Sequence, residues 1–146
     1  SLSKFDNEHG MANSRARLRM TTLYQVAAAN KGIVVGTGNK VEDFGVGFYT
    51  KYGDGGVDIS PIADCNKTDV WELGKELGIL KEIIDAPPTD GLWDDGRTDE
   101  GQLGLSYKEI EEAMDNENSK NRDKYIQIRK SNLHKMDPIP ICKIPN

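Results

Sequence analysis

Hydroxyl, carboxylate and ammonium side chains alternate with glycines between residues 36 and 58. The glycines are Gly36, Gly38, Gly45, Gly47, Gly53, Gly55 and Gly56. The side chains between them are Thr37, Glu42, Asp43, Lys51, Asp54 and Asp58. Carboxylate oxygens suit Mg²⁺, and an ammonium group binds phosphate. Since glycine lets the backbone turn or approach a ligand closely, this stretch predicts a metal-bound phosphate site.

The apolar run Ile33, Val34 and Val35 directly precedes this stretch. Its short length and β-branched residues predict a buried strand of a parallel sheet. Gly36 and Thr37 would then lie at the carboxyl end of the strand, where open α/β sheets bind ligands. A glycine-rich turn between two elements is the alternative for any one glycine. The whole stretch favours the ligand site.

Two helices are predicted to flank this region. Asn13 or Ser14 would cap the first, which runs to about Asn30 and carries two apolar stripes. The stripes predict contacts on two sides, with the sheet on one and a second subunit on the other. The second helix spans 67–77, and helical spacing predicts that it packs into the core through Val70, Leu73, Gly74 and Leu77.

The chain after the second helix is predicted to be a loop followed by two helices. Residues 85–104 contain Pro, Gly and an acidic run, and long loops of this kind are often lids or binding loops. Ser106 and Glu109 form a capping-box pattern that opens a helix to about Met114. Residues 118–136 predict a last helix, with Tyr125 among its buried residues.

Composition excludes some classes of protein. The chain has 146 residues, enough for a single domain with a core, and 36% of them are hydrophobic. A net charge of −5 disfavours a general nucleic-acid binder, and no apolar stretch is long enough to cross a bilayer. The two cysteines, Cys65 and Cys142, have no zinc-site spacing. They favour a reduced, cytoplasmic protein.

Specific motifs give the chain a resemblance to a known family. The segment from Val34 to Pro61, with Tyr52-Gly53-Asp54-Gly55-Gly56 at its centre, resembles the NAD synthetase family of PP-loop ATP pyrophosphatases. The resemblance extends from about Ala12 to Pro140. It implies an α/β fold, with residues 1–146 as one domain that is part of a Rossmann-like, three-layer, adenine nucleotide α-hydrolase-like structure. The PP-loop motif Ser-Gly-Gly-x-Asp-Ser is absent from the sequence. The resemblance therefore implies that the chain is the C-terminal portion of such a domain, without its N-terminal portion.

The resemblance also implies ATP and metal contacts. Thr37, Lys67 and Thr89 match ATP-binding positions, and Lys67 matches a lysine that stabilises the phosphates in catalysis. Glu42 matches the Mg²⁺ ligand. Because some family members have one residue fewer between Thr37 and Lys51, Asp43 remains an alternative to Glu42.

A second set of residues matches contacts to deamido-NAD. Arg17 lies in Ala16-Arg17-Leu18-Arg19-Met20, which matches the family's Ala-Arg-x-Arg-Met motif. Lys51, Asp58, His134 and Lys135 match further deamido-NAD positions. Taken singly, these residues are more often ordinary surface or turn residues. Their joint occurrence in family order favours function, and the resemblance also implies a homodimer.

The implied activity is that of a ligase in the last step of NAD biosynthesis. ATP adenylates the carboxylate of deamido-NAD with release of pyrophosphate, and ammonia then displaces AMP to give NAD. The ammonia could be free or come from a glutaminase domain. Without the PP-loop portion, the chain alone is expected to be inactive. The alternatives are another PP-loop amidotransferase, such as a GMP-synthetase-like enzyme, and a nucleotide-binding module without catalysis.

Overall fold

Helices and irregular segments make up the described part of the chain. The computed structural model describes residues 2–5 and 7–144. The elements, in order, are η1 (Leu2–Phe5), α1 (Glu8–Ala29), η2 (Lys40–Val46), α2 (Lys67–Glu76), α3 (Lys81–Ile84), α4 (Asp99–Leu103), α5 (Tyr107–Asp115) and α6 (Arg122–Met136). The element η2 is a π-helix.

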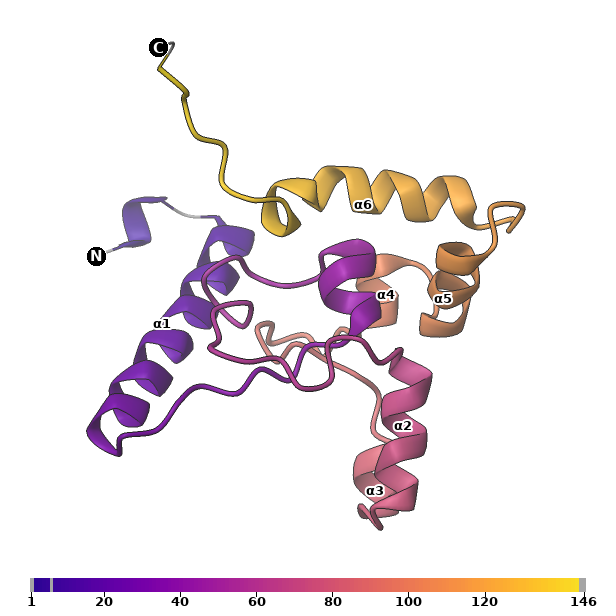
Figure 1. Cartoon of the computed structure of the whole chain (residues 1–146), viewed down its shortest axis with the longest axis horizontal. Helices are drawn as coiled ribbons and strands as arrows, with labels where there is room; N and C mark the ends of the chain where they lie inside the picture. The colour runs from indigo at the N-terminus through magenta and orange to yellow at the C-terminus, as the bar shows by residue number, and fades with distance from the viewer. Residues whose placement is uncertain (1, 6, 145–146) are drawn as a thin grey trace.

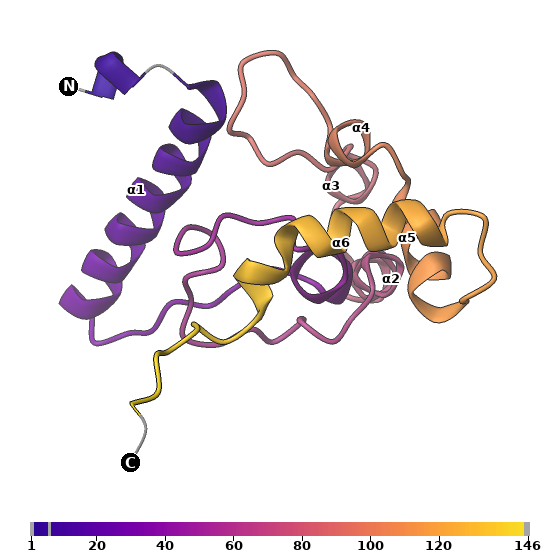
Figure 2. The same ribbon diagram turned by 90° about the horizontal axis from the view of Figure 1, so that it is seen from above.

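The helices form a packed group with α1 at one side. Helices α5 and α6 pack against η2, and α2 contacts both α3 and α5. Figure 1 shows α6 above η2, with α2 and α3 extending below, while α1 is joined to the group by irregular chain. Seen from above in Figure 2, the loop before α4 reaches toward the first turns of α1. Two long irregular segments, 30–39 and 47–66, therefore lie between α1 and the other helices.

The core lies between η2, α5 and α6. Its members are fully or almost fully buried: Val41, Val46, Leu103, Leu105, Tyr107, Ile110, Ala113 and Tyr125. Asn39 fixes the start of η2, because its side chain accepts hydrogen bonds from the backbone amides of Val41 and Glu42. The core thus holds η2, and with it Glu42, against α5.

The predicted parallel sheet is not found among the described residues. Val35 and Ile59 form an isolated parallel bridge, supported by a 2.7 Å hydrogen bond from the Gly36 amide to the Ile59 carbonyl. The parallel direction agrees with the prediction, but one bridge is not a sheet. Ile33 and Val35 remain 58% and 52% exposed, since no neighbouring strand in the described chain covers them. A pair of strands this short cannot bury such side chains by itself.

Helix α1 begins earlier than predicted. The side chain of Asn7 caps it by accepting a hydrogen bond from the Gly10 amide, so residues 8–12, which precede the predicted cap at Asn13 or Ser14, are also helical. Only Ala12 and Ala16 are buried in this helix, whereas Leu18 is 67% exposed. The described chain therefore covers one side of α1 and leaves its second apolar stripe uncovered.

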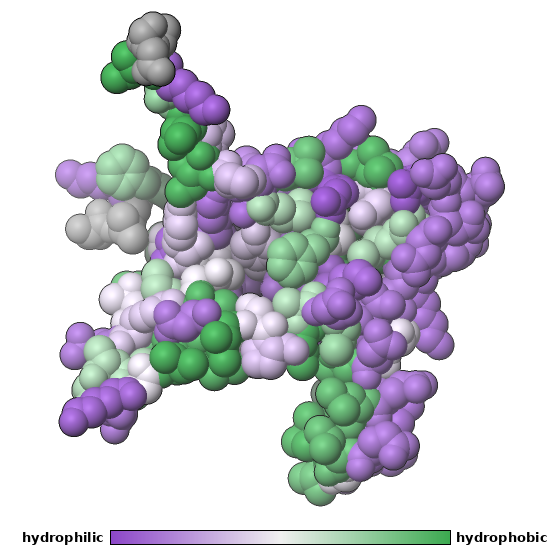
Figure 3. Space-filling model, in the orientation of Figure 1, coloured by the Kyte–Doolittle hydropathy of each residue, from purple (hydrophilic) through white to green (hydrophobic). Residues whose placement is uncertain are grey.

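Helix α2 differs from the prediction in what it buries. Its N-terminus is as predicted, with Asn66 and Asp69 forming a capping box. Leu73 and Leu77, predicted to be core residues, are 45% and 70% exposed. The prediction was wrong because α2 projects from the packed group and only part of its surface meets α3 and α5. Figure 3 shows the resulting apolar surface at the lower end of the molecule.

The last two helices lie close to their predicted positions. The capping box at the start of α5 is present: the Glu109 carboxylate accepts hydrogen bonds from the amide and hydroxyl of Ser106. Helix α6 begins at Arg122 rather than near residue 118. Tyr125 is buried at 6% exposure, as predicted. In the described residues, no helix combines the length and apolar character needed to cross a membrane.

Candidate functional site

Glu42 and Lys67 form the central ion pair of the candidate site. Glu42 lies in η2 and Lys67 is the first residue of α2. The Lys67 ammonium nitrogen lies 3.0 Å from Glu42 Oε1, and the two side chains are only 18% and 15% exposed. Two residues 25 positions apart in sequence are therefore held together in a largely dehydrated place, where charges interact more strongly than at the surface.

Tyr107 and Asp99 continue this pair into the core. The Tyr107 hydroxyl lies 2.5 Å from Glu42 Oε1 and 3.2 Å from Asp99 Oδ2. A hydroxyl has one proton to donate, and the shorter contact assigns it to Glu42. Burial, together with the charge of Glu42, raises the pKa of Asp99 despite the Tyr107 hydrogen bond.

One pocket brings together the residues predicted to contact ATP and metal. Its volume is about 280 Å³, and Thr37, Glu42, Lys67 and Thr89 all line it. These four side chains come from the segment after the bridge, from η2, from α2 and from the loop before α4. The structure therefore gathers them from four separate parts of the chain.

Further carboxylates make this pocket acidic. Asp43, Asp54, Asp90 and Asp99 also line it. Burial raises the pKa of Asp43 to about 6, with additional repulsion from Glu42 and Asp54. Burial also raises the pKa of Asp54, although the Thr50 amide donates a hydrogen bond to its carboxylate and opposes the rise. A cation entering the pocket would relieve this repulsion.

The donor set fits a hydrated Mg²⁺ that is also held by phosphate. Among the described residues, no group of three or more His, Cys, Asp or Glu side chains is arranged to hold a metal ion. Mg²⁺ usually keeps several waters and uses one or two carboxylates plus substrate phosphates. Both contacts to Glu42 end on Oε1. Oε1 of Glu42 is thus occupied. Asp99 lines the same pocket, and its Oδ1 is buried without a hydrogen-bond partner among the described residues. Glu42 suits the role of the single carboxylate ligand.

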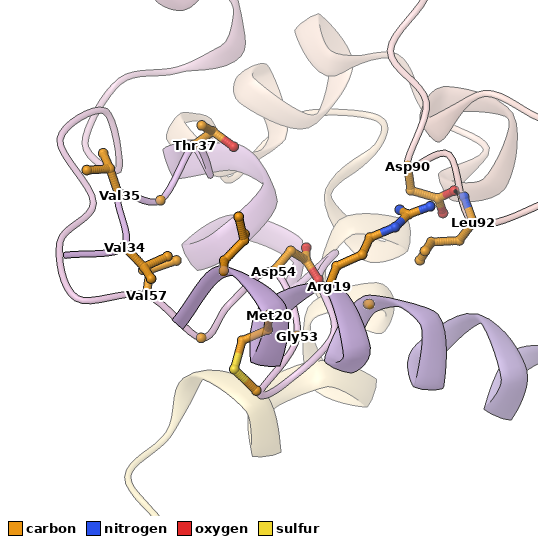
Figure 4. Close-up of a pocket in the computed structure, with 14 residues that line it drawn as sticks. Arg19, Met20, Val34, Val35, Thr37, Gly53, Asp54, Val57, Asp90 and Leu92 are labelled. Atoms are coloured by element: carbon orange, nitrogen blue, oxygen red, sulfur yellow. Dashed lines mark hydrogen bonds between the residues drawn. The ribbon is translucent and has the colours of Figure 1, made fainter. Parts of the chain in front are cut away.

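A second, more apolar pocket adjoins the acidic one. Its volume is about 260 Å³, and it lies between α1 and the segments 34–37 and 53–57. Figure 4 shows Arg19 from α1 extending toward Asp90 and Leu92, with Asp54 nearby. Thr37, Asp54 and Asp90 line both pockets. The two pockets therefore adjoin along these three residues.

The loop before α4 is attached to α1 by arginines. Arg15 donates a hydrogen bond to the Leu92 carbonyl at 2.6 Å, and Arg19 donates to the Gly91 carbonyl at 3.0 Å. These arginines lie beyond the first turn of α1, so their charge does not oppose the positive end of its dipole. In the loop, the Arg97 guanidinium lies 3.9 Å above the Trp93 ring. The attached loop carries Thr89 into the wall of the acidic pocket and Asp90 into the walls of both pockets.

Three of the residues predicted to bind deamido-NAD lie side by side. Arg17 Nε donates to the Lys51 carbonyl at 3.2 Å, and the Lys51 ammonium donates to the His134 carbonyl at 2.6 Å. The Lys135 ammonium donates to the carbonyls of Gly47 and Tyr49, each at 2.8 Å. Burial lowers the pKa of Lys135. The described lining of the acidic pocket does not include these residues, so the two predicted sets occupy separate places.

Asp58 lies apart from the other predicted residues. Its Oδ2 accepts a 2.8 Å hydrogen bond from the Val34 amide, and its Oδ1 accepts one from the Tyr24 hydroxyl at 3.2 Å. These contacts support the single bridge between Val35 and Ile59. Asp58 thus has a structural role in addition to the predicted contact with substrate.

Sequence reasoning missed Tyr107 and the individual role of Asp99. Tyr107 is fully buried at the start of α5, and it looks like an ordinary core aromatic next to a capping box. Asp99 belongs to an acidic run that was interpreted as part of a loop. The Ser106–Glu109 capping pattern was the one sequence signal that concerned Tyr107, because it places this residue at the start of a helix rather than in a loop.

Comparisons with known proteins identify the family. A family model described as NAD synthase matches residues 2–140. The NH(3)-dependent NAD(+) synthetase of Alkaliphilus oremlandii is 45% identical over 135 residues, covering 91% of this chain and 53% of the relative. That of Carboxydothermus hydrogenoformans is 49% identical over 104 residues, covering 71% of this chain and 42% of the relative. The chain thus spans about half the length of these curated relatives.

Solved structures agree with this result. The NMN synthetase of Francisella tularensis superposes with a TM-score of 0.85 at 36% identity, over 99% of this chain and 59% of that one. The NH3-dependent NAD synthetase of Campylobacter jejuni gives a TM-score of 0.63 at 25% identity, over 90% of this chain and 54% of that one. The fold is therefore that of the pyridine-nucleotide synthetases. Within that class, the chain belongs to the NAD synthase family.

Proposed function

We propose that this chain is part of a ligase that amidates deamido-NAD with ammonia, using ATP and Mg²⁺, to give NAD, AMP and pyrophosphate. The observation that carries the proposal is the acidic pocket, where Thr37, Glu42, Lys67 and Thr89 meet. Relatives named NH(3)-dependent NAD(+) synthetase support the same activity. A free carboxylate is a poor acyl donor, and adenylation would supply the leaving group that attack by ammonia needs.

The side chains of the pocket suit the first half of this reaction. Lys67 would bind phosphate oxygens and offset charge that develops as pyrophosphate leaves. Glu42 would hold Mg²⁺, which when bound neutralises phosphate charge and orients the leaving group. Thr37 and Thr89, which both line the pocket, would contact ATP. Because Lys67 already pairs with Glu42, binding of the metal and the phosphates would divide that pair between two ligands.

The second set of residues suits a dinucleotide with negative charge. Arg17, Lys51, His134 and Lys135 place cationic or hydrogen-bonding groups near one another. The Arg17, Lys51 and Lys135 side chains donate to backbone carbonyls, which a phosphate or carboxylate would replace. The uncovered stripe of α1, which includes Leu18, is compatible with the proposed homodimer. Asp58 would contribute a hydrogen-bond acceptor from the bridged segment.

Amidation of nicotinate mononucleotide is a second candidate function. The solved structure with a TM-score of 0.85 over 99% of this chain is titled an NMN synthetase. Both reactions would use the same ATP chemistry. They differ in the substrate, because deamido-NAD carries an adenylate half that nicotinate mononucleotide lacks. Family membership speaks against a GMP-synthetase-like activity. Binding of ATP without release of pyrophosphate would support the non-catalytic nucleotide-binding module.

The experiment compares substrates in the polypeptide that the whole gene encodes. With ATP, Mg²⁺ and ammonium, we expect NAD from deamido-NAD and less product from nicotinate mononucleotide, measured by chromatography together with pyrophosphate release. Lys67→Met should abolish both products. Preferred amidation of the mononucleotide would replace the first candidate with the second, and amidation of xanthosine monophosphate alone would exclude both. The 146-residue chain by itself is expected to give no product.

A further inference from the structure

Tyr107 touches both charged groups that the proposed function assigns to ATP and metal. Its hydroxyl donates to Glu42 Oε1 at 2.5 Å, and the Lys67 ammonium lies 4.9 Å from the centre of its ring. The same ammonium lies 3.0 Å from that oxygen of Glu42. One aromatic side chain therefore contacts both members of the ion pair, through its hydroxyl and through its ring face.

The surrounding structure holds Tyr107 in one orientation. The residue is fully buried, and the Trp71 ring packs edge-on against it with centroids 5.9 Å apart. Its backbone amide donates to Glu100 Oε1 at 2.8 Å, just after the N-cap Ser106. The core therefore holds the Tyr107 ring, and α4 and α5 hold its backbone. Together they fix the position of the hydroxyl.

This contact determines which oxygen of Glu42 remains for a ligand. Both contacts to the carboxylate, from Lys67 and from Tyr107, end on Oε1. Among the described residues, no donor reaches Oε2. A carboxylate held by one oxygen presents the other in a fixed direction, which favours a cation that binds to a single oxygen. Tyr107→Phe would keep the ring and release the carboxylate to rotate.

We propose that Tyr107 is a positioning residue that orients Glu42 and Lys67 for a divalent cation and the triphosphate of a nucleotide. The inference rests on the proposed function and adds a residue to it. Tyr107 has no exposed surface, so it acts through Glu42 and Lys67 and does not touch substrate. The hydroxyl fixes the metal ligand, while the ring supports the ammonium.

The test measures binding of Mn²⁺, as a probe for Mg²⁺, in its complex with ATP to the polypeptide that the whole gene encodes, by water-proton relaxation. We expect Tyr107→Phe to weaken Mn²⁺ binding roughly 10- to 100-fold, as loss of a partner that orients a ligand does in other metal sites. Tyr125→Phe is the matched control, because Tyr125 belongs to the same core and no hydrogen bond of its hydroxyl is found among the described residues. It should bind Mn²⁺ like the unaltered chain.

A double-mutant comparison separates this inference from the proposed function. Glu42→Gln should remove the binding, and Tyr107→Phe should then have no further effect. If Glu42→Gln removes binding while Tyr107→Phe leaves it unchanged, the positioning role is wrong and the metal role of Glu42 stands. If the unaltered chain does not bind Mn²⁺, or Glu42→Gln leaves binding unchanged, both are wrong.

A second variant covers the case in which Tyr107→Phe does not fold by circular dichroism. Tyr107→Met removes the hydroxyl with a flexible apolar side chain that can adapt to the buried space, and it leaves Glu42 itself unchanged. We expect a loss of Mn²⁺ affinity of the same order. Binding equal to that of the unaltered chain would overturn the positioning role.

Discussion

Replacing Asp43 with Asn should stabilise the chain, and more so as the pH rises. Burial raises the pKa of this carboxyl from 3.8 to about 6, with added repulsion from Glu42 and Asp54. The folded chain therefore binds the proton more tightly than the unfolded chain does. The stability that the Asp43 carboxyl contributes is fully present below pH 3.8, and it is lost as the pH rises toward 6.

The size of the effect follows from the difference between the two pKa values. A rise of about two units corresponds to about 3 kcal/mol of lost stability once the carboxyl is ionised in both states. Between pH 4.5 and 7.5, the advantage of Asp43→Asn should grow by about 2 kcal/mol. An offset that does not depend on pH, from changed hydrogen bonds, would leave this growth unaltered.

The assay is urea unfolding followed by circular dichroism at several pH values, in EDTA so that no cation occupies the pocket. Asp64→Asn is the control, because the Asp64 side chain is fully exposed, at 101%, and 3.7 Å from Lys40. Its unfolding free energy should differ little from that of the unaltered chain at every pH. A constant difference for Asp43→Asn between pH 4.5 and 7.5, or a decrease, would refute the argument from burial.

Three further predictions concern stability and can be checked by the same unfolding measurement. Ser106→Ala removes the cap of α5 and should cost about 1 kcal/mol, whereas retention of full stability would mean that the capping box contributes nothing. Gly104→Ala should cost about 1–2 kcal/mol, because Gly104 has a φ of 67° and a Cβ there would lie 2.7 Å from the Lys124 ammonium; Gly32→Ala, with its nearest atom at 3.7 Å, is the control. Leu77→Gln should change stability by less than about 0.5 kcal/mol, since Leu77 is 70% exposed, and a large loss would show that it is covered in solution.

Local signals in the sequence predicted local structure well. The Ser106–Glu109 pair caps α5 as predicted, because its hydrogen bonds lie within four consecutive residues. The family resemblance was confirmed, because its motifs are specific and lie in the matched segment. The roles it implies for individual residues stay predictions, although the structure brings Thr37, Glu42, Lys67 and Thr89 into one pocket.

Features that depend on distant parts of the chain were harder to predict. Helical spacing correctly gave Leu73 and Leu77 a common face, but spacing does not reveal whether another element covers it. The run at 33–35 has strand character, yet a strand needs partners on its edges, and within residues 2–5 and 7–144 only the segment at Ile59 supplies one. The contact from Tyr107 to Glu42 spans 65 residues and leaves no periodic pattern.

The two tryptophans give the protein a built-in optical probe. Trp71 packs against Tyr107 in the core, whereas Trp93 lies in the loop beneath Arg97 and donates a hydrogen bond from its indole nitrogen to Asp90 at 3.1 Å. The sequence contains no other tryptophan. In a chain with Trp71→Phe, the tryptophan fluorescence would therefore come from the loop alone. Its emission wavelength would follow the hydration of that loop as nucleotides are added, without any attached dye.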